Sequence, residues 1–472
     1  MKKLTHLSVK ELRHGYSNKE FSPSEVAKAY LDKIHQDDGK IGAYITVNEN
    51  ISIKKQSESL LFGIPYCAKD NLLTKGLRTT CASKMLENFI PPYSATVCQR
   101  LEQNGAILLG KTNMDEFAMG STTENSAIKV TKNPLNTLYS PGGSSGGSAA
   151  SVAGFEAAFS LGSDTGGSVC QPASFCGVVG LKPTYGLVSR YGLVGFAPSL
   201  DQIGVITRNV YDSAMVLSEI AFHDKKDSTS AHIKEKDYTK GIEKGICGLR
   251  IGVISDFLSD GADTEITNAV KNAAVLFEKL GASVEEVSIP VLKHACSAYL
   301  ILSSSEAYST LSRYDGLRFG YSPDIDSSLD WLYTHTRSSG FGSEVKRRLL
   351  SGSIFLSQEY FEKYYRTAER VRFAIIESYK RAFEKYDILL SPVSPTTATK
   401  LGFASQNAVE RFRSDRYTCC ANLAYLPSMT VPFTKTSDNL PVGVLMTAQK
   451  FCEDTLLRAG FALECEKRGD FA

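Results

Sequence analysis

The sequence predicts an α/β protein: a single large domain whose central mixed β-sheet is covered by helices on both faces. First, short apolar runs recur along the chain without the polar–apolar alternation of half-exposed strands. Second, helical segments separate many of these runs. Third, the pattern continues on both sides of residues 225–244, the most polar and linker-like stretch. This continuity favours a single domain that spans residues 1–472.

The first clear helix signal lies at residues 22–25, which read Ser-Pro-Ser-Glu. This stretch combines an N-cap serine, a proline at the first helical position and a glutamate three residues after the cap. Val26, Tyr30 and Ile34 follow at helical spacing. One face of the helix should therefore be buried against the rest of the domain.

The other elements follow from the same patterns of apolar residues. Residues 111–123 indicate a loop with a helical turn. Further helices are expected at residues 94–104, 264–280 and 454–467, with a long, mostly helical region at about 292–385. Strands are expected at residues 43–47, 63–70, 106–110, 157–161, 178–181, 249–254, 282–287, 387–390, 428–431 and 442–447.

Composition excludes several classes of protein. Hydrophobic residues make up 42% of the chain and charged residues 22%, and the net charge of +2 gives no overall field for nucleic acid or an anionic membrane. No apolar run approaches the roughly 20 residues of a membrane span, and the first residues lack the apolar core of a secretory signal. Eleven scattered cysteines without a C-x-x-C pair indicate reduced thiols. We expect no membrane partner and a bacterial cytoplasmic location, with an organelle left open.

Two glycine- and serine-rich loops stand out in the first half of the chain. Residues 140–151 read Ser-Pro-Gly-Gly-Ser-Ser-Gly-Gly-Ser-Ala-Ala-Ser, and residues 162–168 read Gly-Ser-Asp-Thr-Gly-Gly-Ser. Glycine lets another group approach the backbone closely, and a serine hydroxyl can attack or relay a proton. Flexible linkers share this composition, but linkers do not usually alternate with buried segments. The two loops are therefore candidates for a reactive site.

Two known motifs match the first loop only in part. Residues 142–147 satisfy G-x-x-x-x-G, but a phosphate-binding P-loop continues with Lys-Ser/Thr, and Ser148 follows here. Residues 142–146 also satisfy the G-x-S-x-G pattern of a hydrolase nucleophile, and residues 143–147 satisfy it equally well. That site needs a downstream histidine, and none of the four available lies in a recognisable motif. They are His223, His232, His294 and His335.

A lysine can replace histidine as the base for a serine nucleophile. Lys69 ends an apolar segment, so its amine should point inward, where burial would lower its pKa towards the neutral form. The alternative is a surface lysine paired with Asp70. Ser168 is the candidate nucleophile, at the start of a helix, because the backbone N–H groups of residues 164–168 are little obstructed and can face a developing oxyanion.

Lys69, residues 141–149 and residues 162–168 together resemble the amidase signature family, in sequence and in spacing. The resemblance implies the amidase signature fold and a Ser–cisSer–Lys triad. Lys69 would be the base, Ser144 the proton relay after a non-proline cis peptide bond, and Ser168 the nucleophile.

The same resemblance assigns supporting roles. Ser145 would support the relay serine, and the backbone of Thr165, Gly166 and Gly167, up to the nucleophile, would form the oxyanion hole. The catalytic core would then occupy about residues 60–210.

Further stretches resemble the glutaminase subunits of tRNA-dependent amidotransferases within that family. This similarity runs across nearly the whole chain. The stretches are residues 81–86, 111–120, 189–194, 199–204, 313–316 and 344–348.

The resemblance implies a glutaminase that forms a glutamyl-enzyme and releases ammonia. A channel would carry the ammonia to subunits B and C, where Glu-tRNA(Gln) becomes Gln-tRNA(Gln), or Asp-tRNA(Asn) becomes Asn-tRNA(Asn). The sequence leaves the choice of tRNA open. No metal or cofactor would be bound by this subunit, and ATP and Mg²⁺ would be used by the complex.

Substrate recognition is expected in the helical region at about 292–385 and beyond it. Arg348 would hold the glutamine carboxylate with two hydrogen bonds, Asp415 would hold its ammonium group, and Tyr299 would form a wall of the pocket. Arg347 is an equal candidate, because adjacent residues of a helix face different ways.

The chain departs from the family pattern in two places. Cys170 stands two residues after the nucleophile, where the family usually has arginine, and residues 416–420 are less apolar than usual. Two alternatives therefore stay open: a stand-alone amidase for another small amide, and a catalytically impaired scaffold subunit.

Overall fold

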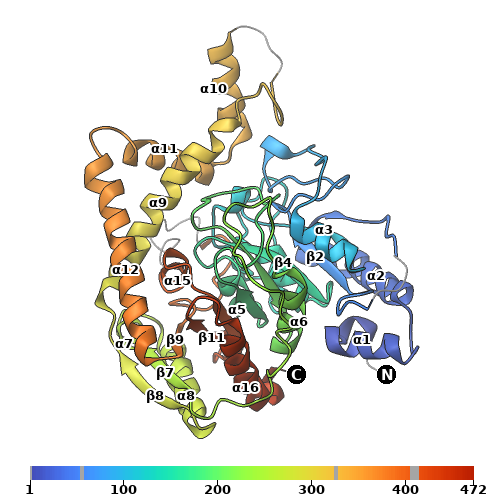
Figure 1. Cartoon of the computed structure of the whole chain (residues 1–472). Coiled ribbons are helices and arrows are strands. Elements are labelled where there is room, and N and C mark those ends of the chain that lie inside the picture. The colour runs from blue at the N-terminus through green and yellow to red at the C-terminus, as the bar shows by residue number, and fades with distance from the viewer. Residues whose placement is uncertain (1–2, 54–57, 324–327, 404–413, 472) are drawn as a thin grey trace.

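A computed structural model describes residues 3–53, 58–323, 328–403 and 414–471 of the chain. Within these residues, eleven strands form one sheet in the order β1-β3-β2-β4-β6-β5-β10-β11-β9-β7-β8 (Figure 1). Strand β2 is parallel to β3 and β4, and β7 is parallel to β8 and β9, whereas the strands between these groups pair antiparallel. The predicted α/β fold with a mixed sheet is confirmed.

Most predicted elements are present, with ends that differ by a few residues. The strands are Tyr44–Val47 (β1), Pro65–Lys69 (β2), Ile107–Thr112 (β3), Phe159–Asp164 (β4), Val179–Lys182 (β5), Gln202–Thr207 (β6), Arg250–Ile254 (β7), Ser283–Val287 (β8), Ile388–Pro392 (β9), Ser428–Lys435 (β10) and Pro441–Ala448 (β11). The helices are Val9–Ser17 (α1), Pro23–Ile41 (α2), Thr96–Gln103 (α3), Gly146–Ala153 (α4), Cys170–Phe175 (α5), Val210–Ile220 (α6), Ser255–Leu258 (α7), Thr264–Lys279 (α8), Ala295–Thr310 (α9), Leu329–Gly340 (α10), Ser343–Phe355 (α11), Arg366–Lys385 (α12), Cys419–Leu423 (α15) and Glu453–Phe471 (α16).

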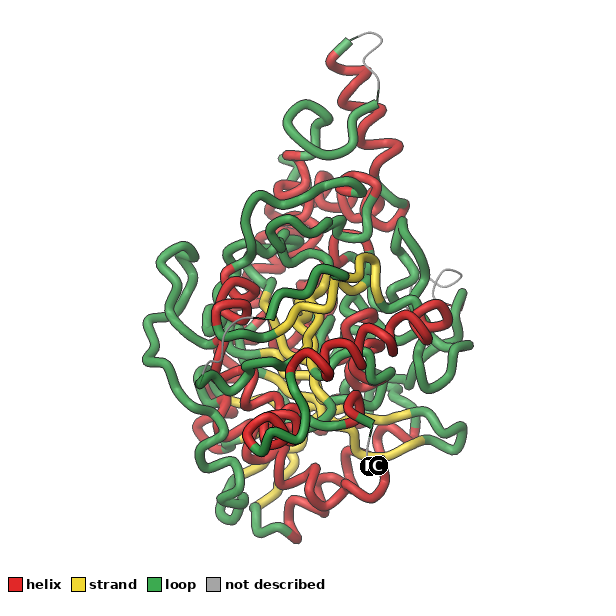
Figure 2. The backbone as a smooth tube through the Cα atoms, turned by 90° about the vertical axis from the view of Figure 1, so that its right-hand side faces the viewer, coloured by secondary structure: helices red, strands yellow, loops and turns green. Residues whose placement is uncertain are grey.

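Helices cover both faces of the sheet, which lies as a twisted layer through the middle of the molecule (Figure 2). Helix α16 packs on β10 and β11 and also contacts α6 and α8, so these three helices form one layer. Helix α5 packs on β5, β10 and β11 and contacts α4, which places α4 and α5 in the other layer. The strands are therefore buried on both sides, which explains their unbroken apolar runs.

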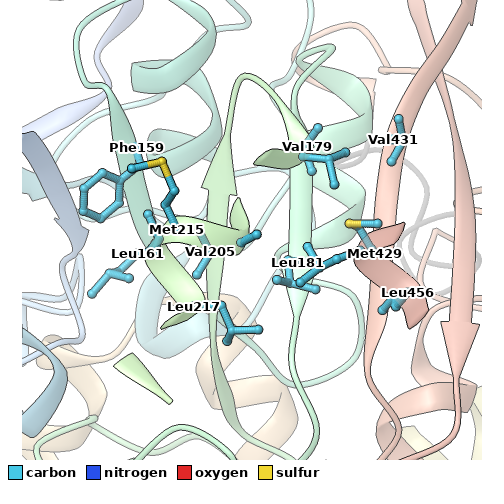
Figure 3. Packing of buried hydrophobic residues seen from close by; sticks show 14 of the residues in the cluster. Phe159, Leu161, Val179, Leu181, Val205, Met215, Leu217, Met429, Val431 and Leu456 are labelled. Carbon is cyan, nitrogen blue, oxygen red and sulfur yellow. The ribbon is translucent and has the colours of Figure 1, made fainter. Parts of the chain in front are cut away.

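The main hydrophobic core fills the space between the sheet and the layer of α6, α8 and α16. Figure 3 shows side chains of β4, β5, β6 and β10 packed against those of α6 and α16. Phe159, Leu161, Val205 and Leu217 are completely buried there. A rigid core under β4 is relevant to function, because this strand leads directly into the second glycine-rich loop.

Helices α9 to α12 form a separate helical region at one end of the sheet, and α10 projects from the rest of the molecule (Figure 1). A second hydrophobic cluster joins this region to α15 and to neighbouring loops, and it includes Tyr299 on α9, Val345 on α11 and Ile375 on α12. Helix α15 contacts both α9 and α12. In the described residues, none of the helices combines the length and the apolar character needed to cross a bilayer.

The structure also differs from the sequence-based expectation. Strand β6 and helices α1 and α6 were not predicted, and the second half of the first glycine-rich loop is helix α4. Strand β4 continues to Asp164, so the second loop starts later than expected. Helix α5 begins at Cys170, after Val169 as N-cap, so Ser168 precedes the helix rather than starting it. Glycine and serine are poor helix formers, and tertiary packing overrides that preference in α4.

Candidate active site

Lys69 lies at the end of β2, between the parallel strands β3 and β4, and its side chain is completely buried. Its Nζ lies 2.7 Å from Ser144 Oγ, 2.9 Å from Ser145 Oγ and 3.1 Å from the carbonyl oxygen of Ser163. Strand β2 thus carries the predicted base into the first glycine-rich loop, as the sequence led us to expect.

The three contacts of Lys69 are not equivalent once their hydrogens are assigned. The Ser163 carbonyl can only accept, and Ser145 Oγ donates its own hydrogen to that carbonyl over 3.0 Å. A neutral Lys69 amine can therefore donate its two hydrogens to Ser163 O and Ser145 Oγ. Its lone pair is then left for the hydroxyl of Ser144, 2.7 Å away. This arrangement distinguishes Ser144, which can give a proton to Lys69, from Ser145, which orients the amine.

Burial lowers the pKa of the Lys69 ammonium to about 7, because desolvation penalises its charged form. The carboxylates of Asp115, Asp164 and Asp201 oppose this effect and keep the pKa from falling further. A lysine with a pKa near neutrality can exchange a proton at physiological pH, as a general base requires.

Ser144 follows a cis peptide bond from Gly143, as the family resemblance predicts, and stands just before helix α4. The next residue connects the two glycine-rich loops, because the Ser145 N–H donates to the carbonyl oxygen of Ser168 over 3.2 Å. Ser168 is 7% exposed, and its hydroxyl makes no hydrogen bond within the described residues. The three residues of the predicted triad are thus close together, and the candidate nucleophile is not engaged elsewhere in this part of the chain.

Asp164 folds the second loop around its own carboxylate. Oδ1 accepts from the N–H of Gly167 over 2.8 Å, and Oδ2 accepts from the N–H of Val169 over 2.7 Å. The N–H of Gly167 is therefore already engaged, in contrast to the expected role in the oxyanion hole. The N–H groups of Thr165, Gly166 and Ser168 have no acceptor among the residues the structure describes. The loop offers these donors to a ligand.

Neighbouring side chains leave no room for a Cβ at the two glycines of this loop. A Cβ on Gly166 would lie 2.5 Å from Cζ of Tyr299, and a Cβ on Gly167 would lie 2.1 Å from Oγ1 of Thr418. Thr418 Oγ1 also donates to the carbonyl of Gly166 over 2.6 Å. The ring of Tyr299 therefore lies against the second loop, and its role as a wall of the substrate pocket stays a prediction. Thr418 was missed, because no signal in the sequence places residue 418 beside residue 166.

The structure separates the two candidate arginines of α11. Arg348 has 7% of its side chain exposed and stacks over Phe196, with its guanidinium carbon 5.4 Å from the ring centroid. Arg347 is 37% exposed. Both form ion pairs with Glu344, Arg348 over 2.9 Å and Arg347 over 2.6 Å. Because only Arg348 is buried towards the site, it is the better candidate for holding a substrate carboxylate.

Asp415 belongs to the same electrostatic cluster. By surface area the residue is only half-buried, but enough protein surrounds its carboxyl group for desolvation to raise its pKa to about 7. The positive charge of Arg348 opposes this rise, and burial together with the charge of Asp415 raises the pKa of Tyr299. Arg348, Asp415 and Tyr299 therefore interact electrostatically with one another, while their roles in binding a substrate stay a prediction.

Cys170 replaces the arginine that the family resemblance leads one to expect. Its thiol is buried with Val393 and Leu445, and Sγ lies 3.8 Å from the carbonyl oxygen of Gly180. Burial raises the pKa of the Cys170 thiol, so the group is a poor nucleophile. The backbone of the catalytic loop is held by Asp164 and Asn422, whose Nδ2 donates to Asp164 Oδ1 over 2.8 Å. The side chain of residue 170 is not part of that support.

Across the described residues, no three or more His, Cys, Asp or Glu side chains are grouped in a way that could hold a metal ion. The arrangement of Lys69, Ser144 and Ser168 can deliver a serine alkoxide to a carbonyl carbon while backbone N–H groups face the developing oxyanion.

Comparisons with known proteins agree with this geometry. Residues 25–457 match the family model described as Amidase. The chain is 48% identical over 471 residues to the A subunit of Glutamyl-tRNA(Gln) amidotransferase of Thermoanaerobacter pseudethanolicus, covering 98% of this chain and 96% of the relative.

Solved structures show the same similarity in three dimensions. The crystal structure of the A subunit of Glutamyl-tRNA(Gln) amidotransferase from Thermotoga maritima superimposes with a TM-score of 0.84 at 39% identity, over 98% of this chain and 95% of that one. The native peptide amidase of Stenotrophomonas maltophilia has a TM-score of 0.81 at 28% identity, over 98% and 97% of the two chains. The fold, the site and the relatives agree, and the chain belongs to the amidase family.

Proposed function

We propose that the chain is the glutaminase subunit of a tRNA-dependent amidotransferase, in which it hydrolyses glutamine and supplies ammonia. The observation that carries this proposal is the 2.7 Å contact between Lys69 Nζ and Ser144 Oγ, beside the loop that carries Ser168. The full-length similarity to proteins named as the A subunit of Glutamyl-tRNA(Gln) amidotransferase supports the choice of reaction.

In the proposed reaction, Ser168 Oγ attacks the side-chain carbonyl carbon of glutamine. Its proton passes to Ser144 Oγ as Ser144 gives its own proton to the neutral Lys69. The N–H groups of Gly166 and Ser168 stabilise the oxyanion. The proton on Lys69 then returns through Ser144 to the departing nitrogen, and ammonia leaves. Water attacks the glutamyl ester by the same relay, which releases glutamate and restores Ser168.

The partners and further steps belong to the same proposal. Ammonia would pass to subunits B and C, where Glu-tRNA(Gln) is amidated with ATP and Mg²⁺ on a partner subunit, and the complex would act in the bacterial cytoplasm. We assign catalysis to about residues 60–210 and much of the substrate pocket to residues 292–385, with Asp415 added from outside that range.

Covalent trapping tests the assignment of substrate and nucleophile together. A glutamine analogue with a diazoketone in place of the amide should attach to Ser168, because the serine attacks the carbon next to the carbonyl group. Peptide mass spectrometry would locate the adduct, and excess glutamine should protect the residue. An adduct on any other residue, or no protection by glutamine, would contradict the proposal.

The two arginines of α11 provide a matched pair for substrate recognition. Arg348→Ala should raise the KM for glutamine by about 10- to 100-fold with a smaller change in kcat, because a buried charged hydrogen bond to the carboxylate is lost. Arg347→Ala should leave KM within about twofold, since exposed ion pairs contribute little. Steady-state glutaminase kinetics of the complex measure both. A larger rise in KM for Arg347→Ala would reverse the assignment.

A stand-alone amidase is the second candidate, since the peptide amidase of Stenotrophomonas maltophilia shares the fold. The 48% identity with an amidotransferase subunit opposes it. Dependence of glutamine hydrolysis on the partner subunits and on Glu-tRNA would distinguish the two, because an independent amidase needs neither.

A further inference from the structure

Thr123 has a backbone conformation that threonine rarely adopts. It is completely buried, and its φ is 58°, in the left-handed region. For a β-branched residue this conformation is strained, and it persists only where the surroundings enforce it. A strained residue beside a reactive loop calls for a functional explanation.

The hydroxyl of Thr123 holds both ends of the segment that carries the two serines beside Lys69. Thr123 Oγ1 donates to the carbonyl oxygen of Gly142 over 2.8 Å and accepts from the N–H of Gly146 over 3.0 Å. Gly143, Ser144 and Ser145 lie between these two points. One side-chain oxygen thus fixes the start and the end of this stretch, which we call the relay segment.

The side chain of Asp115 holds Thr123 in place. Its Oδ2 accepts from the N–H of Thr123 over 2.9 Å, and its Oδ1 accepts from the N–H and the side-chain amide of Asn125, each over 3.2 Å. The N–H of Asp115 donates to the carbonyl of Ser144 over 3.3 Å. The same carboxylate lies against Gly143, where a Cβ would come within 2.2 Å of Oδ2.

The relay segment packs tightly against Thr123 at the start of α4. A Cβ on Gly146 would lie 2.2 Å from Thr123 Oγ1, which shows how closely the hydroxyl approaches the start of α4. The strain at Thr123 is therefore compensated by a set of buried hydrogen bonds that converge on the relay segment.

We infer that Thr123 is a positioning residue for the proton relay: its hydroxyl, on a backbone that the Asp115 carboxylate holds, keeps Ser144 aligned between Lys69 and the nucleophile. The inference rests on the proposed glutaminase function. The hydrogen bonds that the structure describes for Thr123 go to Gly142, Gly146 and Asp115, so loss of its hydroxyl should slow the chemical step without changing glutamine binding.

Thr123→Val tests this role, because it keeps the shape of the side chain and removes the hydroxyl. In the assembled amidotransferase, kcat for glutamine hydrolysis should fall by about 10- to 100-fold, with KM within about twofold. Thr123→Ser, which retains the hydroxyl, should recover most of kcat. The matched control is Thr122→Val, because the Thr122 hydroxyl makes no hydrogen bond in the described part of the chain; its kcat should match that of the unchanged protein.

Further variants distinguish a positioning role of Thr123 from a folding defect and from a failure of the proposed glutaminase function. Thr123→Gly also removes the hydroxyl but accepts a positive φ without strain, so it should fold even where the valine variant does not, with the same loss of kcat. Ser168→Ala, assayed in parallel, decides the glutaminase function itself. Three results would each overturn the role of Thr123. They are an unchanged kcat in the folded valine or glycine variant, equal losses of kcat in the serine and valine variants, and a KM that rises as kcat falls.

Discussion

Ser168→Ala is expected to reduce glutamine-dependent amidation of tRNA by at least about 10⁴-fold, the usual cost of losing a nucleophile in a covalent mechanism. Amidation supported by added ammonia should continue at the unaltered rate, because the partner needs only the product of this site. Both rates can be measured on the same complex as conversion of Glu-tRNA to Gln-tRNA.

The substitution should leave the fold intact, since the Ser168 hydroxyl makes no hydrogen bond within the described residues. Ser160→Ala is a suitable control: Ser160 is completely buried in strand β4, which leads into the loop that carries Ser168, and its hydroxyl lies 3.5 Å from the carbonyl of Leu161. It should keep glutaminase activity. A scaffold subunit without chemistry of its own would behave differently, because Ser168→Ala would then leave glutamine-dependent amidation unchanged.

Local sequence patterns predicted the parts of the site that are set by local structure. Lys69 was found because it ends an apolar run, and the structure places it at the end of a strand buried on both faces. The capping box at Ser22 is present, with the Glu25 N–H 3.3 Å from Ser22 Oγ. Such features need only neighbouring residues, so composition and spacing are sufficient to predict them.

Long-range contacts could not be predicted in the same way. The hydrogen bond between Thr418 and Gly166 joins residues 252 positions apart, and no periodicity links them. The engagement of the Gly167 N–H by Asp164 is local, but it depends on the exact turn of the loop. Strand β6 was not predicted, and its role as the antiparallel link between β4 and β5 follows from the sheet as a whole.

Lys69→Ala should lower kcat for glutamine hydrolysis by about 10³-fold, because the proton that Ser168 releases through Ser144 loses its acceptor and the departing nitrogen loses its proton donor. Lys69→Arg should not restore activity, since a guanidinium stays protonated at any accessible pH. Steady-state kinetics of the two variants in the complex measure this. Substantial activity in either variant would show that another group is the base.

The pH dependence provides an independent test of the same base. Only the neutral amine can accept a proton, and burial lowers the pKa of Lys69 to about 7. Below that pH, kcat of the unaltered protein should fall about tenfold per unit, and above it kcat should level off. Asp415 also has a pKa of about 7, but its carboxylate pairs with the substrate ammonium once glutamine is bound. The titration of Asp415 should therefore affect kcat/KM, and Asp415→Asn should keep the fall of kcat at low pH. The residual kcat of Lys69→Ala should not fall at low pH in this way. If it does fall, a group other than Lys69 is the base that accepts the proton.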